Sequence, residues 1–547
     1  MNPPATATLQ RPASRRLSGA RRGRAFRIDP KRAAPTVVAA AFAIAYVIVS
    51  PPSLDLAAHL LRAKLFSSEG FGIWNNWWYG GHHVPGYSVL FPPVAALLTP
   101  QVAAGLAACL SAALFEILVH DEFGEDAWLG ALWFGAGTAT NLFTGRLTFA
   151  FGLLPAVASA LALARGRTWT AVALGVVTAL ASPVAALFAA LAAAAFATGK
   201  LVKQRSVRAA VPGLLVIIAA LLPVALLSVA FPEGGSEPFT LATLWPIPAI
   251  ALVAIVLIPK RQVTLLAGIA LYALGCIAAY KVDTPVGSNA ARLGPLLAGP
   301  LAALLWIRHR KAFLLVAALP LLYFQWQAPI RDVRTSAGDP SVKISYYRPL
   351  LAFLEKQSGP PFRVEIPFTR FHWEAYEVAP KFPLARGWER QLDIKYNSLF
   401  YNGRLTAATY DAWLHQLAVR YVAVSDADLD YSAHQETNLI DRGLPYLQLV
   451  FRSAHWHVYA VSKPTPIAQG PASLQQLGPN SLTLNASRAG TVDLRVRFTP
   501  YWALGEGSGC VIDNGGFTEL RLRSAGPVRL VTHFSLGRIG ATSPRCN

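Results

Sequence analysis

Two polar side chains four residues apart open the stretch SLDLAAHLLRAKLF, residues 53–66. Asp55 and His59 project from one face of a helix at this spacing, so they are placed to share a ligand or a proton. The structural alternative is capping, because Ser53 suits an N-cap and an acidic first turn stabilises the helix dipole. The apolar residues of the stretch also share one face, which predicts a helix lying in the membrane interface.

The stretch WNNWWYGGHHVPGY, residues 74–87, combines aromatic rings with a Gly-Gly turn and two His. An aromatic belt at the lipid headgroups explains Trp and Tyr but not the turn. Rings beside polar donors suit sugars, so we expect a sugar-binding or acceptor-binding surface. Metal ligation is the weaker interpretation, because no Cys or carboxylate cluster completes a site at ligand spacing. The predicted set is Trp74, Trp78, Tyr79, His82, His83, Tyr87 and, from a second crowded stretch, Trp388.

These stretches belong to a membrane protein. Hydrophobic residues make up 54% of the chain and charged residues 14%. Between residues 33 and 325, apolar runs of roughly 15 to 27 residues recur, the length that a helix needs to cross a bilayer. If the basic clusters between the runs face the cytoplasm, about eleven helices result and the C-terminal region lies outside. The predicted spans are 33–50, 93–118, 127–141, 147–164, 168–181, 183–198, 209–231, 240–258, 263–280, 295–307 and 312–325.

The net charge of +20 owes much to residues 1–32, where Arg and Lys crowd next to the first apolar run. This placement predicts a basic cytoplasmic tail beside anionic lipid, and no nucleic-acid partner. Arg far exceeds Lys and Met occurs once, which is typical of a high-GC bacterial genome. We therefore expect a multi-pass protein of the bacterial plasma membrane, with the N-terminus cytoplasmic and the C-terminal domain extracytoplasmic.

With this topology, polar and turn-forming residues gather at the extracytoplasmic ends of the helices. They include Arg146, the helix break at Ser182-Pro183, and Asn289 with Arg292. Broken helices with polar ends at one depth usually line a cavity, because backbone groups exposed to lipid would lack hydrogen-bond partners. The loop at residues 51–92 lies on the same side. A site, if present, opens outward.

The C-terminal region divides into two predicted units. Residues 326–444 alternate helical and strand patterns, which indicates an extracytoplasmic α/β region. Residues 445–547 carry short alternating runs typical of a β-sandwich. Cys510 and Cys546 lie in this oxidising compartment and are able to bridge, whereas Cys109 and Cys276 fall within membrane helices.

The order of these parts resembles the GT-C superfamily of polyprenyl-phosphate-dependent glycosyltransferases: a first transmembrane helix, an outward loop opening with an Asp, many further helices and a terminal extracytoplasmic domain. More narrowly, DLAAHL followed by WNNWWYGGHHVPGYSVLFPP looks like bacterial membrane proteins often labelled as related to 6-pyruvoyl-tetrahydropterin synthase. The resemblance covers residues 33 to about 330 and implies a GT-C-like membrane domain. The chain departs from many members because it lacks a clear D-D or D-E pair.

The resemblance implies a role for each predicted site residue. Asp55 would be the general base and His59 would orient it or share its proton, while Arg292, Asn289 and Arg146 would bind the donor phosphate. The implied donor is a polyprenyl-phosphate-linked sugar, held with membrane lipid, and the acceptor a cell-envelope glycan or lipid. Direct attack would invert the anomeric centre. The metal ligands are unknown, and a divalent cation as cofactor is left open.

Two other classes of function remain. A transporter or flippase of envelope lipid or glycan would also have many helices, and the intramembrane Glu116 favours that class. A non-catalytic envelope scaffold would need neither Asp55 nor Arg292. Convergence of these two residues on one cavity favours transfer chemistry over both.

Overall fold

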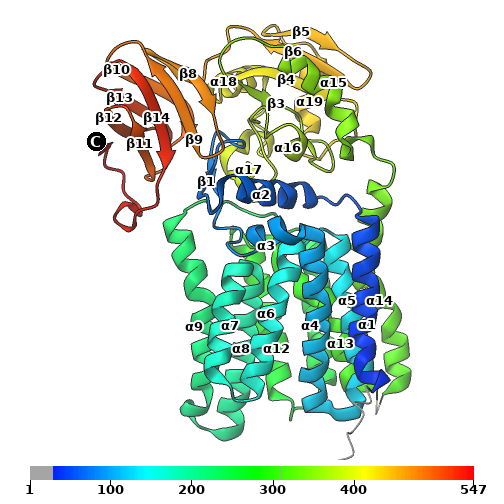
Figure 1. The fold of residues 1–547 in the computed structure, drawn as a ribbon. Coiled ribbons are helices and arrows are strands. Elements are labelled where there is room, and N and C mark those ends of the chain that lie inside the picture. The colour runs from blue at the N-terminus through cyan, green and yellow to red at the C-terminus, as the bar shows by residue number, and fades with distance from the viewer. Residues whose placement is uncertain (1–28, 308–309) are drawn as a thin grey trace, which may run out of the picture.

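The computed structural model describes residues 29–307 and 310–547; most of the basic tail at residues 1–32 lies outside this part. Three layers stack along the long axis of the molecule (Figure 1). A helix bundle forms the base, a thin layer built on helix α2 (Leu56–Glu69) lies across one end of it, and two domains cover that layer. We call these two domains the head domains.

Every predicted span is mostly helical in the structure, and two of them, 93–118 and 240–258, each contain two helices. Seven helical segments of the described residues are long and apolar enough to cross a membrane, by length and composition. The chain is therefore a membrane protein, and the number of eleven spans stays a prediction. The bundle helices are α1 (Pro30–Val49), α4 (Pro100–Phe123), α5 (Trp128–Phe143), α6 (Leu147–Ala164), α7 (Thr168–Ala181), α8 (Pro183–Gln204), α9 (Val207–Ala230), α11 (Pro246–Leu257), α12 (Val263–Lys281), α13 (Leu293–Trp306) and α14 (Lys311–Ser336).

Proline decides two of the helix boundaries. The predicted break at Ser182-Pro183 is present, and the Ser182 hydroxyl caps α8 by accepting from the Ala185 N–H at 3.3 Å. The predicted span 93–118, in contrast, is two helices, α3 (Phe91–Leu98) and α4. Thr99 separates them with a φ of 73°. The cause is Pro100, which suits a first helical position but disfavours helical backbone in the residue before it.

The intramembrane carboxylate of Glu116 has a partner at the bundle end remote from the head domains. Arg32, in the first turn of α1, donates from Nε to Glu116 Oε1 at 2.9 Å. This ion pair joins α1 to α4. The pairing gives Glu116 a structural role, so its presence no longer favours transport.

The layer between bundle and head domains consists of α2 (Leu56–Glu69), a two-stranded hairpin of β1 (Trp74–Asn75) and β2 (His82–His83), and α3. We expected α2 to lie on lipid, but protein covers it on both sides. Leu56 packs against the bundle, whereas Leu61 packs into the core of a head domain. Apolar residues around much of the helix allow it to be buried between two domains.

The first head domain is an α/β domain. Its mixed sheet has the order β3-β4-β6-β5, with β3 parallel to β4 and the other pairs antiparallel. The predicted sandwich, residues 445–547, includes β5 and β6. This assignment is wrong, because β6 pairs with β4 and β5 pairs with β6. The elements are η3 (Pro340–Val342), α15 (Ile344–Glu355), β3 (Arg363–Glu365), α16 (Glu374–Glu377), α17 (Arg390–Tyr396), η4 (Ser398–Phe400), α18 (Ala407–Gln416), β4 (Val419–Ser425), α19 (His434–Asp441), β5 (Leu447–Arg452) and β6 (Trp456–Val461).

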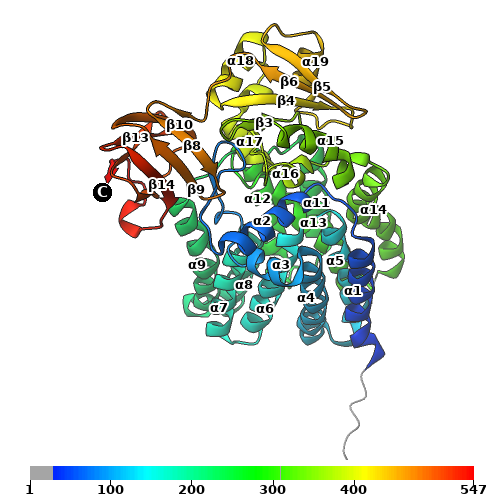
Figure 2. The same ribbon diagram turned by 45° about the horizontal axis from the view of Figure 1, so that its top comes forward.

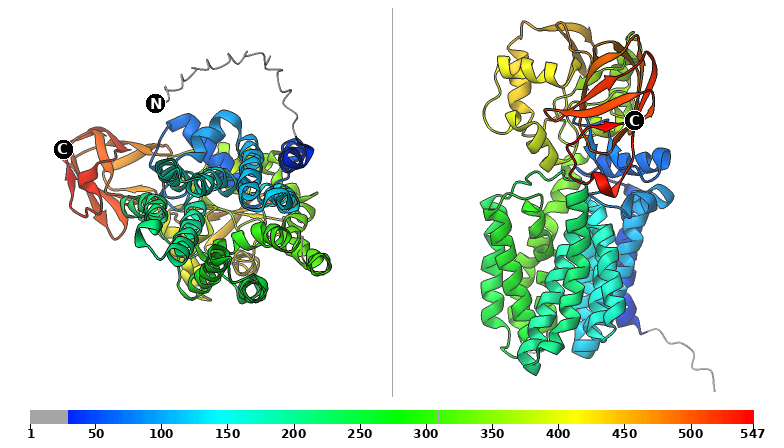
Figure 3. Two further views of the ribbon diagram at one scale, coloured as in Figure 1. Left: turned by 90° about the horizontal axis from the view of Figure 1, so that it is seen from below. Right: turned by 90° about the vertical axis from the view of Figure 1, so that its left-hand side faces the viewer.

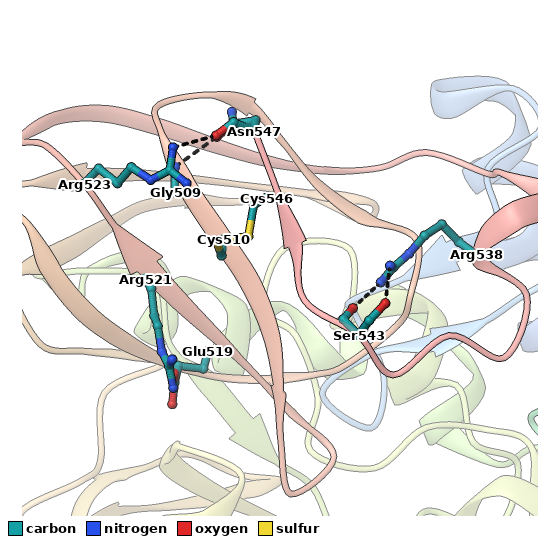
Figure 4. Close-up of a disulfide and its surroundings, with 9 residues drawn as sticks. All are labelled: Gly509, Cys510, Glu519, Arg521, Arg523, Arg538, Ser543, Cys546 and Asn547. Carbon is teal, nitrogen blue, oxygen red and sulfur yellow. Dashed lines mark hydrogen bonds and ion pairs between the residues drawn. A yellow bond between two sulfur atoms is a disulfide. The ribbon is translucent and has the colours of Figure 1, made fainter.

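The second head domain is a sandwich of two antiparallel sheets, ordered β15-β12-β13-β10-β7 and β11-β14-β9-β8. It stands beside the α/β domain over the α9 side of the bundle (Figure 2). Cys510 and Cys546 form a disulfide between two paired strands (Figure 4). The strands are β7 (Ala468–Gln469), β8 (Ala472–Leu477), β9 (Ser481–Ala486), β10 (Gly490–Arg497), β11 (Trp502–Glu506), β12 (Gly509–Asn514), β13 (Phe517–Leu522), β14 (Gly526–Thr532) and β15 (Arg545–Cys546).

Candidate functional site

The Asp55 carboxylate is not used as a helix cap. Asp55 occupies the N-cap position of α2, yet its side chain makes no capping hydrogen bond. Ser53, the cap expected from the sequence, is buried and its hydroxyl has no hydrogen-bond partner among the described residues. The Asp55 side chain instead faces the side chain of Trp388 in the α/β domain, which acts to lower the pKa of the carboxyl. The capping alternative is therefore not realised.

Three arginines surround Asp55. Burial raises the pKa of its carboxyl, while the charges of Arg292, Arg146 and Arg62 act in the opposite direction. Arg292 ends the 3₁₀ helix η2 (Gly287–Arg292), Arg146 precedes the first turn of α6, and Arg62 lies on α2. The structure thus brings Asp55, Arg146 and Arg292 together at the head-facing end of the bundle, although they are far apart in sequence.

Arg146 and Arg292 form a strongly positive pair. Burial, followed by the charge of Arg292, lowers the pKa of Arg146 to about 10. Among residues 29–307 and 310–547, no hydrogen bond or ion pair engages either guanidinium; Arg292 stacks over the Phe149 ring at 5.8 Å. Arg146 also stands at the N-terminus of α6, where backbone N–H groups favour an anion. The two side chains together can bind a phosphate.

Arg62 faces a different partner. Its guanidinium forms a buried ion pair with Glu389 and stacks over the Tyr87 ring at 3.6 Å. Tyr87 is half-buried beside Asp55. Burial does most to raise the pKa of Tyr87 to about 12, and the charge of Asp55 acts in the same direction. Tyr87, a member of the predicted aromatic loop, thus lies next to the carboxylate.

Two further residues border the arginine pair. Asn289 lies on η2 with Arg292 and is half-buried, with no side-chain hydrogen bond to the described residues. Glu237, in the loop after α9, accepts from the Ser288 hydroxyl at 3.2 Å. Burial raises the pKa of Glu237, and the charges of Arg292 and Asp55 also act on it. Glu237 could not be selected from the sequence, because it is one of two acidic residues in an ordinary Gly-Pro-rich loop.

His59 positions the loop that carries Arg146. Its Nε2 donates to the Gly145 carbonyl oxygen at 3.0 Å, and its Nδ1 lies 3.3 Å from the Thr148 hydroxyl. Burial and the charge of Arg62 lower the His59 pKa to about 3, so the ring is neutral and Thr148 donates to it. Both nitrogens are occupied, and no side-chain hydrogen bond joins His59 to Asp55 in the described chain.

The aromatic hairpin is buried between the domains, which differs from the expected sugar-binding surface. Trp74 packs edge-on against Trp502 of the sandwich at 5.8 Å. Trp78 and Tyr79 hydrogen-bond to the α/β domain, Trp78 through the Ala375 carbonyl oxygen. Apart from Tyr87, the residues of this loop that were predicted to bind sugar or acceptor are all less than 9% exposed, namely Trp74, Trp78, Tyr79, His82 and His83. Their rings are therefore covered by protein.

The two His of the hairpin are fully bonded. His83 lies between Glu233 Oε1, at 2.8 Å from Nδ1, and the Thr499 hydroxyl, at 2.9 Å from Nε2. The Nε2 atom of His82 lies 3.2 Å from the side-chain nitrogen of Asn75. Among the described residues no group of three or more His, Cys, Asp or Glu is arranged to hold a metal ion. We therefore assign no metal ligands.

Trp388 stands where the α/β domain meets Asp55. Its ring stacks face to face on His372 at 3.5 Å, with an interplanar angle of 6°. His372 is buried and adopts an unusual φ of 57°, and burial lowers its pKa to about 4. The Arg390 guanidinium lies over the Trp388 ring and, at 4.6 Å, over the ring of the exposed Tyr431. The neutral His372 thus supports Trp388. No feature of the sequence predicts this pairing.

An apolar cavity of about 960 Å³ lies within the bundle. Leu293 and Gly294, directly after Arg292, line one end of it, and Lys203 lines the other. Phe188 also lines it and packs edge-on against Phe149, the ring beneath Arg292. The cavity therefore ends next to the arginine pair.

Comparison with solved structures finds similarity to the archaeal oligosaccharyltransferase AglB from Archaeoglobus fulgidus, in complex with an inhibitory peptide and a dolichol-phosphate. The TM-score is 0.33 and the identity 14%, over 72% of this chain and 69% of that chain. This likeness is too weak to assign an activity. No protein-family model and no curated protein matches the sequence significantly.

Proposed function

We propose that the protein transfers a sugar from a polyprenyl-phosphate donor to an extracytoplasmic acceptor of the cell envelope, with Asp55 as general base. The observation that carries this proposal is the uncapped Asp55 carboxylate beside the Arg146–Arg292 pair. A base and an anion-binding pair at one place are what displacement of a phosphate leaving group requires.

In the proposed reaction the acceptor hydroxyl attacks the anomeric carbon and gives its proton to Asp55. The bond from the anomeric carbon to the phosphate oxygen breaks, and both its electrons leave with the lipid phosphate. Arg292 and Arg146 neutralise that phosphate through bidentate hydrogen bonds, and Asn289 adds a donor. The raised pKa of Asp55 makes it a better proton acceptor than an exposed carboxylate.

Lipid and acceptor have separate places in this proposal. The apolar cavity next to Arg292 suits the polyprenyl chain, since its walls are mostly Ala, Leu and Phe side chains. Trp388 and Tyr87 flank Asp55, and the exposed Tyr431 lies further out beside Arg390. These rings suit an acceptor sugar, while His59 and the buried hairpin hold the site in shape.

Purified protein in lipid nanodiscs, incubated with labelled polyprenyl-phosphate sugars and envelope extracts, tests the proposal. Asp55→Asn should lower the transfer rate by about 10²- to 10⁴-fold, the usual contribution of a general base. Asp283→Asn is the matched control, because Asp283 is an exposed carboxylate on the loop before η2. The proposal fails if no donor is used, or if Asp55→Asn is as active as the control.

One observation favours a lipid flippase as the second candidate. The cavity runs from Leu293 to Lys203, and so reaches both ends of the bundle. Flipping of fluorescent polyprenyl phosphate in proteoliposomes, unchanged by Asp55→Asn, would favour this function over transfer.

A further inference from the structure

The sandwich carries an apolar tip that faces the bundle. Phe534 is 41% exposed and Leu536, in the short 3₁₀ helix η5 (Leu536–Arg538), is 76% exposed. In two perpendicular views this segment lies level with the head-facing ends of the bundle helices, next to α9 (Figures 1 and 3). A large aliphatic side chain at this height is unpartnered within the described chain.

The tip is rigidly joined to the end of α9. Phe231, directly after α9, lies 5.6 Å from the rings of both Phe534 and Tyr501. The Tyr501 hydroxyl donates to the Ala230 carbonyl oxygen at 2.6 Å, and Ile539 packs on the same cluster. These contacts fix the height of the tip relative to a helix that is long and apolar enough to span the membrane.

The loop is also braced internally. Arg538 donates to the Pro500 carbonyl oxygen at 3.2 Å and to the Ser543 carbonyl oxygen at 2.7 Å (Figure 4). The Cys510–Cys546 disulfide closes the segment that follows. Leu536 is therefore displayed by a well-held loop.

The helix beside the tip has a lipid-facing stripe. Leu222, Leu226 and Val229 of α9 are exposed by 52%, 60% and 64%, and their spacing places them on one face of the helix. In a membrane helix such a face contacts acyl chains. The stripe ends at Val229, two residues before Phe231, the residue that contacts Phe534. A single exposed Leu is ordinary, but a Leu held beside the end of a membrane helix, at the height where its lipid-facing stripe ends, is placed to contact lipid.

We propose that residues 533–539 lie in the bilayer interface, with Leu536 at the boundary of headgroups and acyl chains, so that the sandwich rests on membrane phospholipid. Leu536 and Phe534 supply the apolar contact. The partner is the lipid surface itself, and the contact steadies the sandwich over the hairpin that carries Trp74 and His83. The inference does not depend on the proposed transferase activity.

The test is depth-dependent quenching. Leu536→Cys, in a Cys109→Ser/Cys276→Ser background that keeps the disulfide, is labelled with an environment-sensitive fluorophore. The protein is reconstituted into vesicles of mixed zwitterionic and anionic phospholipids, with or without a nitroxide on the acyl chain near the headgroup. The matched control is Leu449→Cys on β5, which is 44% exposed but lies at the far side of the α/β domain (Figure 1).

We expect the nitroxide lipid to quench the label at 536 several-fold more than the label at 449, and aqueous iodide to do the reverse. Equal quenching of both labels by the nitroxide lipid would overturn the proposal. So would a label at 536 that neither quencher reaches, because that result would mean that protein covers the tip.

Discussion

The buried Arg62–Glu389 ion pair is predicted to hold the α/β domain on α2. The two side chains are only 6% and 7% exposed. Arg62→Met keeps the length of the side chain but leaves Glu389 as a buried carboxylate, whose remaining side-chain donor is Gln391 Nε2 at 3.5 Å. Removing one partner of a buried pair costs about 3–5 kcal/mol. Because 1.4 kcal/mol corresponds to a tenfold change in an equilibrium constant, opening of this contact should become about 10²- to 10⁴-fold more frequent.

Hydrogen–deuterium exchange measures this opening directly. The Glu389 N–H donates to the Tyr79 hydroxyl at 2.8 Å and the Leu384 N–H to the Trp77 carbonyl oxygen at 2.8 Å, so both amides report on the contact. Exchange of the segment 384–396 should accelerate by the stated factor in Arg62→Met.

Two variants control this experiment. Lys381→Met removes an ion pair with Glu355 in which both side chains are at least 50% exposed, so it should cost no more than about 1 kcal/mol. Arg62→Met/Glu389→Met replaces the pair with apolar groups and should restore most of the protection. An effect of Arg62→Met below about tenfold, or a double variant no better than the single one, would refute a domain contact based on this pair.

Two further predictions concern stability. Burial raises the pKa of Glu374 to about 8 from 4.5, so the stability that its protonated form contributes is complete below pH 4.5 and is lost as the pH rises through 8. From pH 7 to 8, where His372 is mostly neutral in both states, Glu374→Gln should flatten the fall in melting temperature by removing up to about 1.4 kcal/mol of unfolding free energy per pH unit; an unchanged slope would contradict the assignment. The disulfide joins residues 36 apart in sequence, so Cys510→Ser/Cys546→Ser should lower the unfolding free energy of the sandwich by about 4 kcal/mol. Hydrogen exchange of the strand amides measures this loss, and exchange as slow as in the parent would contradict the prediction.

The membrane helices follow from local sequence, but their boundaries do not follow from hydropathy alone. Each apolar run forms a helix because a run of that length buries its own backbone hydrogen bonds. The break at Ser182 was predictable because Pro183 follows it, and the same reasoning applied to Thr99-Pro100 would have divided the span 93–118. Strand alternation identified β5 and β6, yet it cannot say which sheet a strand joins, since pairing depends on residues far away in sequence.

The candidate site was predicted in part. The polar types and the shared membrane side of Asp55, Arg146 and Arg292 were readable from the sequence, because charged groups at helix ends are rare and conspicuous among apolar runs. The position of Glu237 and the stacking of His372 on Trp388 were not readable from the sequence, since neither Glu237 nor His372 has a distinctive neighbourhood in the chain.

The sequence by itself determined a helical membrane domain followed by an α/β and a β-rich unit, because hydrophobic length and periodicity are local properties of the chain. Only the tertiary structure decided what the aromatic hairpin contacts. The rings of Trp74 and Trp78 could have satisfied a sugar, a lipid headgroup or a protein core equally well, and domain docking selected the last. Docking also brought Trp388 to Asp55, since the approach of two side chains from different domains is fixed by packing across an interface, which no single segment encodes.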